Sequence, residues 1–381
     1  DYDYDYYYYD EDNSNDNKCI PIVSIPRADM SLRRDATLLL KHCNIDIQSD
    51  LLYLDDDIIQ FYFNSDKKNN DNIQIGLTDH NVIRKELQHL SKQVQFILDH
   101  HEDEGQHEYV SDLKRNIAFQ EGHATVGSTC TLVTEQWKQD LSKHNNNMML
   151  DPNVSLALLG TILLDTVNMS PKAGKGTKRD QDAIQFLMTN TDWSLSALYE
   201  KAPHLLESQK DDNPLQPHTT KLFDWLSNAK FDPVFWNEMS TTDCLRIDYK
   251  GYFKSSTTTT TDQDNTLSTF GLSSVLLPLS NFISKPNFTS SVKRFMQDKQ
   301  ITLLGILSCT FDSQSNTPQR SMLLIASNKF IMNSVMDYLL TGPEALFLEL
   351  QRYDMDSKYH SDDKEDDIMM EWIEQGNPKG S

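Results

Sequence analysis

Three clusters of polar residues stand directly after apolar segments of the chain, where strands or helices are expected to end. They are Asp79-His80-Asn81, Asp99-His100-His101 and Asp165. Carboxylate and imidazole groups are the ligands that Mg²⁺, Mn²⁺, Co²⁺ and Zn²⁺ take in proteins. Two such ions a few ångströms apart can clamp a phosphoryl group and generate hydroxide at neutral pH. The residue types therefore predict a metal site suited to phosphate chemistry.

Each cluster taken alone has a simpler explanation. A single Asp after a strand commonly caps a helix or stabilises a turn, and adjacent histidines in a loop are often only solvated. His80 by itself is better explained as a structural or exposed residue. The recurrence of Asp or Asp-His at three successive segment ends favours the metal site, but spacing alone leaves both interpretations open.

Short apolar segments that alternate with helical patterns are typical of a parallel sheet in an α/β protein. Strands are expected over residues 20–25, 51–54, 73–77 and 94–98, and helices over residues 31–43, 82–92, 130–141 and 154–164. The carboxyl ends of parallel strands meet at one edge of a sheet, where ligands bind. We therefore expect the three polar clusters to converge although they are far apart in the sequence.

The chain is expected to have three parts. Residues 1–17 form a disordered, acidic and Tyr-rich low-complexity segment, residues 18–190 the α/β metal-binding domain, and residues 191–381 a helical linker and an α+β domain. The α+β assignment depends on a change of pattern after residue 240. Strands are expected there over residues 245–252, 266–279, 301–310 and 322–325, with helices near 289–297 and 329–340.

The 381-residue chain carries a formal net charge of −22. This charge argues against nucleic acid as a partner, because phosphate backbones attract basic surfaces. It does not exclude a polyanionic substrate, since bound divalent cations dominate the local charge of an acidic site. The five cysteines form no Cys-x-x-Cys pair, and no apolar stretch is long enough to span a membrane. We therefore expect a cytoplasmic protein with reduced cysteines and no membrane partner.

Several motifs resemble the DHH phosphoesterase superfamily, in the branch of eukaryotic exopolyphosphatases, prune-type proteins and family II inorganic pyrophosphatases. In chain order they are IPIVSIPRADMSLRRD, GLTDHN, ILDHH, VGSTCTLV and LLGTILLDTVNM. Three further segments, FDWLSNAKFD, LRIDYKGY and FGLSSVLLPL, are similar to the DHH-associated C-terminal domain. The resemblance implies an N-terminal parallel-sheet DHH domain, a C-terminal α+β domain, and an active site in the cleft between them.

The resemblance implies a role for each matched residue. Asp79 bridges two divalent metal ions, His100 ligates one of them, and Asp165 completes the shell of the other. His101 is the catalytic residue that faces the substrate and donates a hydrogen bond or proton to a phosphate oxygen. Lys250 binds phosphate from the second domain, although an exposed strand lysine is the simpler explanation without the resemblance. Asp99 and His80 are expected to orient the ligands from outside the metal shell.

The implied activity is metal-dependent release of terminal phosphate from inorganic polyphosphate, with Mn²⁺, Mg²⁺ or Co²⁺. Two alternatives remain: an inorganic pyrophosphatase or short-chain polyphosphatase, and a non-catalytic prune-like interaction protein. A phosphodiesterase is a weaker option, because the second domain lacks the Gly-Gly-His-type segment of that branch. The sequence does not fix the oligomeric state.

The chain departs from the family at both ends. An Asp-x-Asp motif is expected after a first strand, but Asp1, Asp3 and Asp5 follow no apolar segment. The chain also stops at Ser381, where the exopolyphosphatases continue into a phosphate-binding Ser-Arg-Lys segment. We therefore expect a trimmed chain, inactive without the missing motif.

Two further segments have alternative explanations. Gly127-Ser128-Thr129 opens a helix, where backbone N–H groups can bind phosphate or the side chains can simply cap the helix. The loop over residues 172–179 carries four basic residues, which can guide a polyanion or only be solvated. They are Lys172, Lys175, Lys178 and Arg179.

Overall fold

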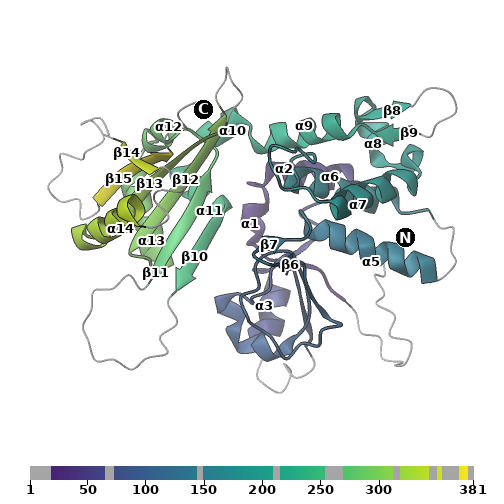
Figure 1. The fold of residues 1–381 in the computed structure, drawn as a ribbon, viewed down its shortest axis with the longest axis horizontal. Coiled ribbons are helices and arrows are strands. Elements are labelled where there is room, and N and C mark those ends of the chain that lie inside the picture. The colour runs from purple at the N-terminus through teal and green to yellow at the C-terminus, as the bar shows by residue number, and fades with distance from the viewer. Residues whose placement is uncertain are drawn as a thin grey trace. The chain divides into compact units, whose positions relative to one another are not determined.

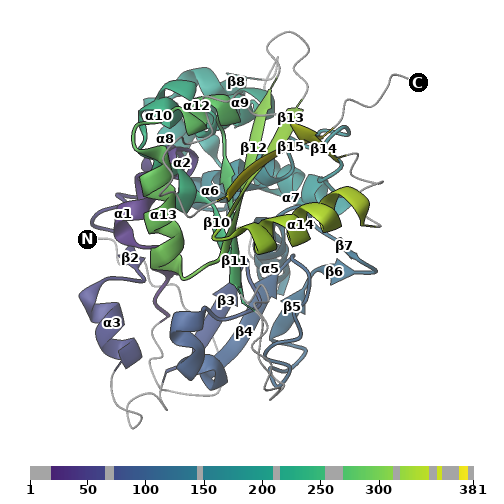
Figure 2. The same cartoon turned by 90° about the vertical axis from the view of Figure 1, so that its left-hand side faces the viewer.

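The computed structural model describes residues 19–64, 73–143, 149–208, 215–253, 269–311, 318–342, 350–353 and 369–375. The acidic segment 1–17, expected to be disordered, lies outside the described residues. The chain divides into two compact units, residues 1–230 and residues 231–381. Figure 1 shows the elements of each unit, and Figure 2 shows them from a second direction.

The first unit contains the parallel strands that the sequence predicts. Its three-stranded sheet has the order β3-β4-β5, and a separate parallel pair is formed by β1 and β2. The strands are β1 (Ile22–Val23), β2 (Leu52–Tyr53), β3 (Ile75–Thr78), β4 (Val94–Asp99) and β5 (Arg115–Ile117). The central strand β4 is buried over Ile97, Leu98 and Asp99, which fits the continuous apolar run of a strand covered on both faces.

A layer of helices forms the larger core of the first unit. The main helices are α2 (Arg34–His42), α5 (Thr129–Lys143), α6 (Pro152–Asp165), α7 (Lys178–Thr189) and α9 (Thr219–Lys230). Helix α6 is the most buried of these. Its start is set by Asp151, whose side chain accepts hydrogen bonds from the N–H groups of Asn153 and Val154, with Pro152 at the first helical position.

Short elements complete the first unit. They are α1 (Arg27–Met30), α3 (Asp57–Asn64), η1 (Lys85–Gln93), β6 (Phe119–Gln120), β7 (His123–Ala124), η2 (Trp193–Leu195), α8 (Ala197–Lys201), η3 (Pro203–Leu205), β8 (Leu206–Ser208) and β9 (Leu215–Pro217). The helix expected over 82–92 is thus a 3-10 helix.

The division between the units lies further along the chain than the boundary expected near residue 190. The segment 191–230, assigned from the sequence to the second part, packs into the helical core of the first unit. The reason is that Leu198, Leu222 and Leu226 are fully buried in one cluster with Leu156 and Leu159 of α6.

The second unit is an α+β domain built on a six-stranded mixed sheet of order β10-β11-β12-β13-β15-β14. Its strands are β10 (Tyr249–Phe253), β11 (Thr269–Val275), β12 (Leu303–Phe311), β13 (Pro318–Ala326), β14 (Leu350–Tyr353) and β15 (Met369–Gln375). Only the β11–β12 pair among these neighbours is parallel. Its helices are α10 (Pro233–Glu238), α11 (Thr241–Ile247), α12 (Leu279–Ile283), α13 (Phe288–Lys299) and α14 (Lys329–Thr341). Helix α11 contacts β11 and α13. Helix α14 contacts β13 and β15 (Figure 2). The predicted fold class, α/β followed by α+β, is confirmed.

One predicted strand of the second unit was wrong in its first half. A strand was expected over 245–252, but α11 continues to Ile247 and β10 begins only at Tyr249. The helix forms because the Ser240 side chain accepts a hydrogen bond from the N–H of Asp243 and donates one to the Asp243 carboxylate. This reciprocal cap outweighs the apolar run that suggested a strand.

Candidate metal centre

The ends of β3 and β4 bring the first two polar clusters together. Asp79 follows β3, and its N–H donates a 2.9 Å hydrogen bond to the carbonyl of Leu98 on β4. Asp79 has φ of +66°, in the left-handed region that side chains rarely adopt. Its Oδ1 lies 3.5 Å from Nε2 of His100. The parallel pairing of the two strands therefore produces a contact between two predicted metal ligands.

Asp79, His100 and His101 form a group in which one possible ligand atom of each lies within 4.8 Å of the others. The side chains of Asp79 and His101 are 62% and 51% exposed, whereas that of His100 is 16% exposed. A cation and a soluble substrate can therefore reach the cluster. The donor set, one carboxylate and two imidazoles, fits a first-row divalent cation.

The tautomer of His100 suits a metal ligand. Its Nδ1 lies 3.1 Å from the carbonyl oxygen of Val126, which can only accept a hydrogen bond. Nδ1 therefore carries the proton, and Nε2 presents its lone pair toward Asp79. Metal-ligating histidines almost always donate their second ring N–H in this way.

Asp99 is fully buried and orients both histidines. Its Oδ1 accepts hydrogen bonds from the N–H of His100 and from Nδ1 of His101, each at 2.8 Å, and its Oδ2 accepts one from Asn81 at 2.7 Å. Burial acts to raise the pKa of Asp99, but the hydrogen bonds from His101, Asn81 and the backbone outweigh it and hold the pKa below its usual value. Asp99 is therefore an ionised group that is hydrogen-bonded to both histidines, and its predicted role in orienting metal ligands stays a prediction.

Asp165 ends α6 and is held by the start of α5. The Ser128 hydroxyl donates a 2.6 Å hydrogen bond to Asp165 Oδ2, and the Thr129 hydroxyl donates one of 2.8 Å to Asp79 Oδ1. Crowding by protein atoms raises the pKa of Asp165, although the residue reaches solvent; the Ser128 hydrogen bond opposes this, and the charge of Asp79 adds to it. The charge of Asp79 thus affects the pKa of Asp165, although Asp165 is not part of the group formed by Asp79, His100 and His101.

The raised pKa of Asp165 also tests whether a cation fits. The negative charges of Asp79 and Asp165 repel each other, which disfavours ionisation of both carboxylates. A cation between them would offset this repulsion and stabilise the two ionised groups. The thiol of Cys130 lies near these carboxylates but is unsuited as a further ligand. Burial and the charges of Asp165 and Asp79 raise its pKa to about 12, so it stays protonated. The residues present therefore fit a divalent cation held by oxygen and nitrogen donors.

The structure places the remaining predicted residues as follows. Nδ1 of His80 lies 2.9 Å from the carbonyl oxygen of Thr78, so this ring contacts the end of its own strand. Lys250 is exposed on β10, in register with Leu272 of β11, in the second unit. The sequence left the roles of Ser128 and Thr129 open, and the structure assigns their hydroxyls to the two carboxylates.

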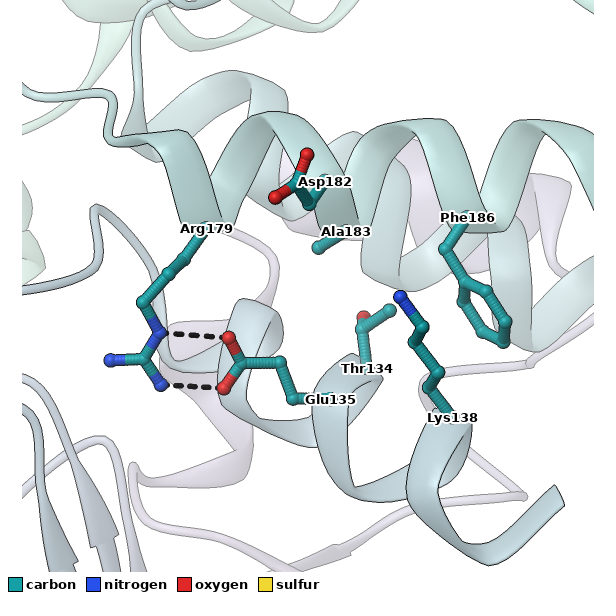
Figure 3. Close-up of a pocket in the computed structure, with 7 residues that line it drawn as sticks. All are labelled: Thr134, Glu135, Lys138, Arg179, Asp182, Ala183 and Phe186. Carbon is teal, nitrogen blue, oxygen red and sulfur yellow. Dashed lines mark hydrogen bonds and ion pairs between the residues drawn. The ribbon is translucent and has the colours of Figure 1, made fainter. Parts of the chain in front are cut away.

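Two basic residues of the loop 172–179 are engaged in ion pairs on α7. Arg179 binds the carboxylate of Glu135 on α5 through two hydrogen bonds (Figure 3). Lys178 pairs with Asp182, also on α7. The hydrogen bond to Glu135 raises the pKa of Arg179, and this effect is larger than the opposing effect of burial. Arg179, Glu135 and Asp182 border a pocket of about 150 Å³ between α5 and α7, and none of the predicted ligands lines it. Arg179 is therefore a structural link between the two helices.

The chain is similar in sequence to curated proteins that are named exopolyphosphatases. The chain is 24% identical over 320 residues to human "Exopolyphosphatase PRUNE1" and 25% identical over 321 residues to the rat protein, in both cases across 84% of the chain. It is 30% identical over 174 residues to a Schizosaccharomyces pombe "Putative exopolyphosphatase", across 44% of the chain and 41% of that protein. The chain spans 58% of the length of the PRUNE1 proteins.

Two further comparisons were made. No family model matches the chain. A solved structure described as a Methanococcus jannaschii "putative family II inorganic pyrophosphatase" superposes with a TM-score of 0.48 and 15% identity, covering 80% of this chain and 78% of the other. Among the described residues, no helix is long and apolar enough to cross a membrane. The curated relatives confirm the resemblance, predicted from the motifs, to the prune-type exopolyphosphatase branch of the DHH phosphoesterase superfamily.

Proposed function

We propose that the protein hydrolyses phosphoanhydride bonds with the help of divalent metal ions and releases terminal phosphate from inorganic polyphosphate. The observation that carries this proposal is the group of Asp79, His100 and His101 at the joined ends of two parallel strands, with Asp165 beside it. The PRUNE1 relatives, named exopolyphosphatases, support the same substrate class.

In this proposal Asp79 and the Nε2 atom of His100 hold a first cation, and Asp165 with Asp79 holds a second. When bound, such cations neutralise phosphate charge and lower the pKa of a bound water. Mn²⁺ or Mg²⁺ is the expected metal, and Co²⁺ a further candidate, since the donors are carboxylates and imidazoles without thiolates.

The role of His101 follows from its orientation. The Asp99 carboxylate accepts a hydrogen bond from Nδ1 and thereby holds the ring, and in this proposal the opposite ring atom, Nε2, interacts with a phosphate oxygen. A hydrogen bond or proton delivered there stabilises the charge that develops on the leaving group. Lys250 supplies a further positive charge for phosphate from the second unit.

We also propose a cytoplasmic location, without nucleic-acid or membrane partners. The support is that all five cysteines are free, as expected in a reducing compartment. Pyrophosphate or short-chain polyphosphate is a second substrate to be compared in the same assay.

The test is phosphate release from long-chain polyphosphate and from pyrophosphate, with Mn²⁺, Mg²⁺ or Co²⁺ and after chelation by EDTA. It is run on residues 1–381 and on the full-length gene product, because the chain spans 58% of the PRUNE1 relatives. We expect metal-dependent release by the full-length product and its loss in Asp79→Asn. Asp182→Asn, which removes an exposed carboxylate on α7, is the control that keeps activity.

Three outcomes decide the matter. Metal-dependent release supports the proposal, and a preference for pyrophosphate moves the substrate to the pyrophosphatase alternative. Bound metal without release by the full-length product favours the interaction-protein alternative. If the full-length product neither binds metal nor releases phosphate, the proposal is contradicted.

A further inference from the structure

A second buried carboxylate, outside the metal cluster, makes more hydrogen bonds than a helix cap requires. Asp180, in the first turn of α7, is fully buried. It accepts hydrogen bonds from the N–H of Gly127 at 2.8 Å, the Thr131 hydroxyl at 2.6 Å, and both the N–H and hydroxyl of Thr177 at 2.7 Å. The bonds to Thr177 form an ordinary capping box, but those to Gly127 and Thr131 cross about 50 residues of chain.

The two distant partners enclose the residues that hold the metal cluster. Between Gly127 and Thr131 lie Ser128 and Thr129, whose hydroxyls donate to Asp165 and Asp79. The residue before Gly127 is Val126, whose carbonyl accepts from His100. Residues 126–131, which we call the orienting segment, therefore contact three predicted metal ligands on one side and Asp180 on the other.

The orienting segment is also closely packed where Asp180 holds it. A Cβ at Gly127 would lie 2.6 Å from the carbonyl oxygen of Lys175 and 2.7 Å from Cγ2 of Thr166. Thr166 is buried and directly follows Asp165. Because Gly127 packs this closely against Thr166, we expect a displacement of the orienting segment to displace the end of α6, where Asp165 lies.

A buried carboxylate is costly unless its oxygens are fully hydrogen-bonded, and removing its partners exposes that cost. Asp180 thus has one arrangement of the orienting segment that satisfies it. Supporting hydrogen bonds of this kind keep ligands within the narrow geometric range that a metal site needs.

We propose that Asp180 is a positioning residue of the metal centre: through Gly127 and Thr131 it fixes the orienting segment that aligns His100, Asp79 and Asp165. This inference rests on the proposed function, because it assumes that those three residues bind metal.

The test is the affinity of the protein for Mn²⁺, measured by calorimetry and by the electron paramagnetic resonance of bound Mn²⁺. Asp180→Asn removes the carboxylate charge and replaces one accepting oxygen with an NH₂ group that cannot accept from an N–H, so the bonds that hold the orienting segment are weakened. We expect about 10- to 100-fold weaker Mn²⁺ binding, the range for losing an outer partner of a metal ligand. Asp182→Asn, two residues further on α7, is the matched control and keeps wild-type affinity.

A purely structural role is separated by a second variant and by the melting temperature of the metal-free protein. Thr131→Val removes one donor to Asp180 without changing the shape of the side chain, and we expect weaker Mn²⁺ binding together with a lower melting temperature. Thr134→Val removes a buried hydroxyl of α5 that donates to the carbonyl of Cys130, and it should keep wild-type Mn²⁺ affinity whatever its effect on the melting temperature. Wild-type affinity in both Asp180→Asn and Thr131→Val, or in Thr131→Val when Asp180→Asn fails to fold, overturns the inference. Absence of Mn²⁺ binding in the wild-type protein instead overturns the proposed function.

Discussion

Oδ1 of Asp99 lies 2.8 Å from Nδ1 of His101, and this bond joins a fully buried carboxylate to a histidine that is half exposed. The other oxygen of Asp99 accepts a hydrogen bond from the side-chain amide of Asn81. The side-chain oxygen of Asn81 in turn accepts one from the N–H of Glu104. The ring of His101 is therefore anchored to the interior through Nδ1, while about half of its side chain is exposed to solvent.

Replacing Asp99 with Asn should lower kcat by about 10- to 100-fold, because an amide cannot accept from Nδ1 of His101 and Nδ2 of Asn81 and also keep the backbone bonds. We expect KM for polyphosphate to change less than kcat. Steady-state kinetics with Mn²⁺ at saturation measure both. Asp103→Asn, which removes a half-exposed carboxylate paired with Arg115, is the control. An Asp99→Asn enzyme with wild-type kcat would contradict the assigned orientation.

Ser128→Ala should weaken metal binding by about tenfold, since Asp165 loses the hydrogen bond that favours its charged form. The loss should be larger at pH 6 than at pH 8, because without that bond the pKa of Asp165 rises further and protonation competes with metal. Titration with Mn²⁺ at the two pH values checks this. The matched control is Thr134→Val, which removes a buried hydroxyl on α5 that bonds only to the carbonyl of Cys130. Equal affinity of Ser128→Ala and wild type at pH 6 would refute the prediction.

The proximity of Asp79, His100 and His101 could be predicted from the sequence because it depends on local rules, whereas their binding of metal stays a prediction. Asp79 and His100 each follow an apolar strand segment, and parallel strands that are consecutive in the chain commonly pair, so their ends meet. Asp99 could be assigned an orienting role because it is the last residue of a buried strand and precedes two candidate ligands.

The supporting contacts could not be predicted, because they join residues whose separation carries no periodic signal. Thr177 and Asp180 show the spacing of a capping box, which locates the start of α7, but nothing in that spacing indicates the bonds from Asp180 to Gly127 and Thr131. The unit boundary was misplaced for a similar reason. The apolar face of α9, with Leu222, predicts a packed helix without identifying the helix it packs on.

The unfolding free energy should fall as the pH drops below about 6.5, the unfolded pKa of histidine. Burial, together with the charge of Arg115, lowers the pKa of His107 in the folded state, although a backbone hydrogen bond at Ser91 opposes this. Its Nε2 accepts a 3.4 Å hydrogen bond from the N–H of Ile83, which protonation abolishes. Because the unfolded chain binds the proton more tightly, this stability is present above pH 6.5 and is lost as the pH falls through the lower folded pKa.

His107→Asn should therefore reduce the loss of stability between pH 7 and pH 5. Asn tolerates the positive φ of 58° at this position. Its shorter side chain does not reach the position of Nε2, so the bond from Ile83 is lost at both pH values and no longer contributes to the pH dependence. The loss of stability is reduced rather than abolished, since burial also lowers the pKa of His42. Urea unfolding at the two pH values measures the difference. His123→Asn, at an exposed position, should keep the wild-type dependence, and an identical dependence in His107→Asn would count against the argument.

Lys285→Met should destabilise the second unit by about 3 kcal/mol, through the loss of charge-assisted hydrogen bonds and the stranding of buried carbonyls. The Lys285 side chain is 9% exposed, and its ammonium group donates to the carbonyls of Trp236, Asn237 and Met239 at 2.7–2.9 Å. These carbonyls lie at the C-terminal end of α10, where the helix dipole also favours a positive charge. Met matches the length of the lysine stem, so the variant tests the charge and its bonds more than packing. Urea unfolding followed by circular dichroism measures the change, and Lys329→Met, at an exposed site on α14 of the same unit, is the control. A change within about 0.5 kcal/mol of that control, the usual range for surface substitutions, would show that solvent satisfies the carbonyls as well as Lys285 does.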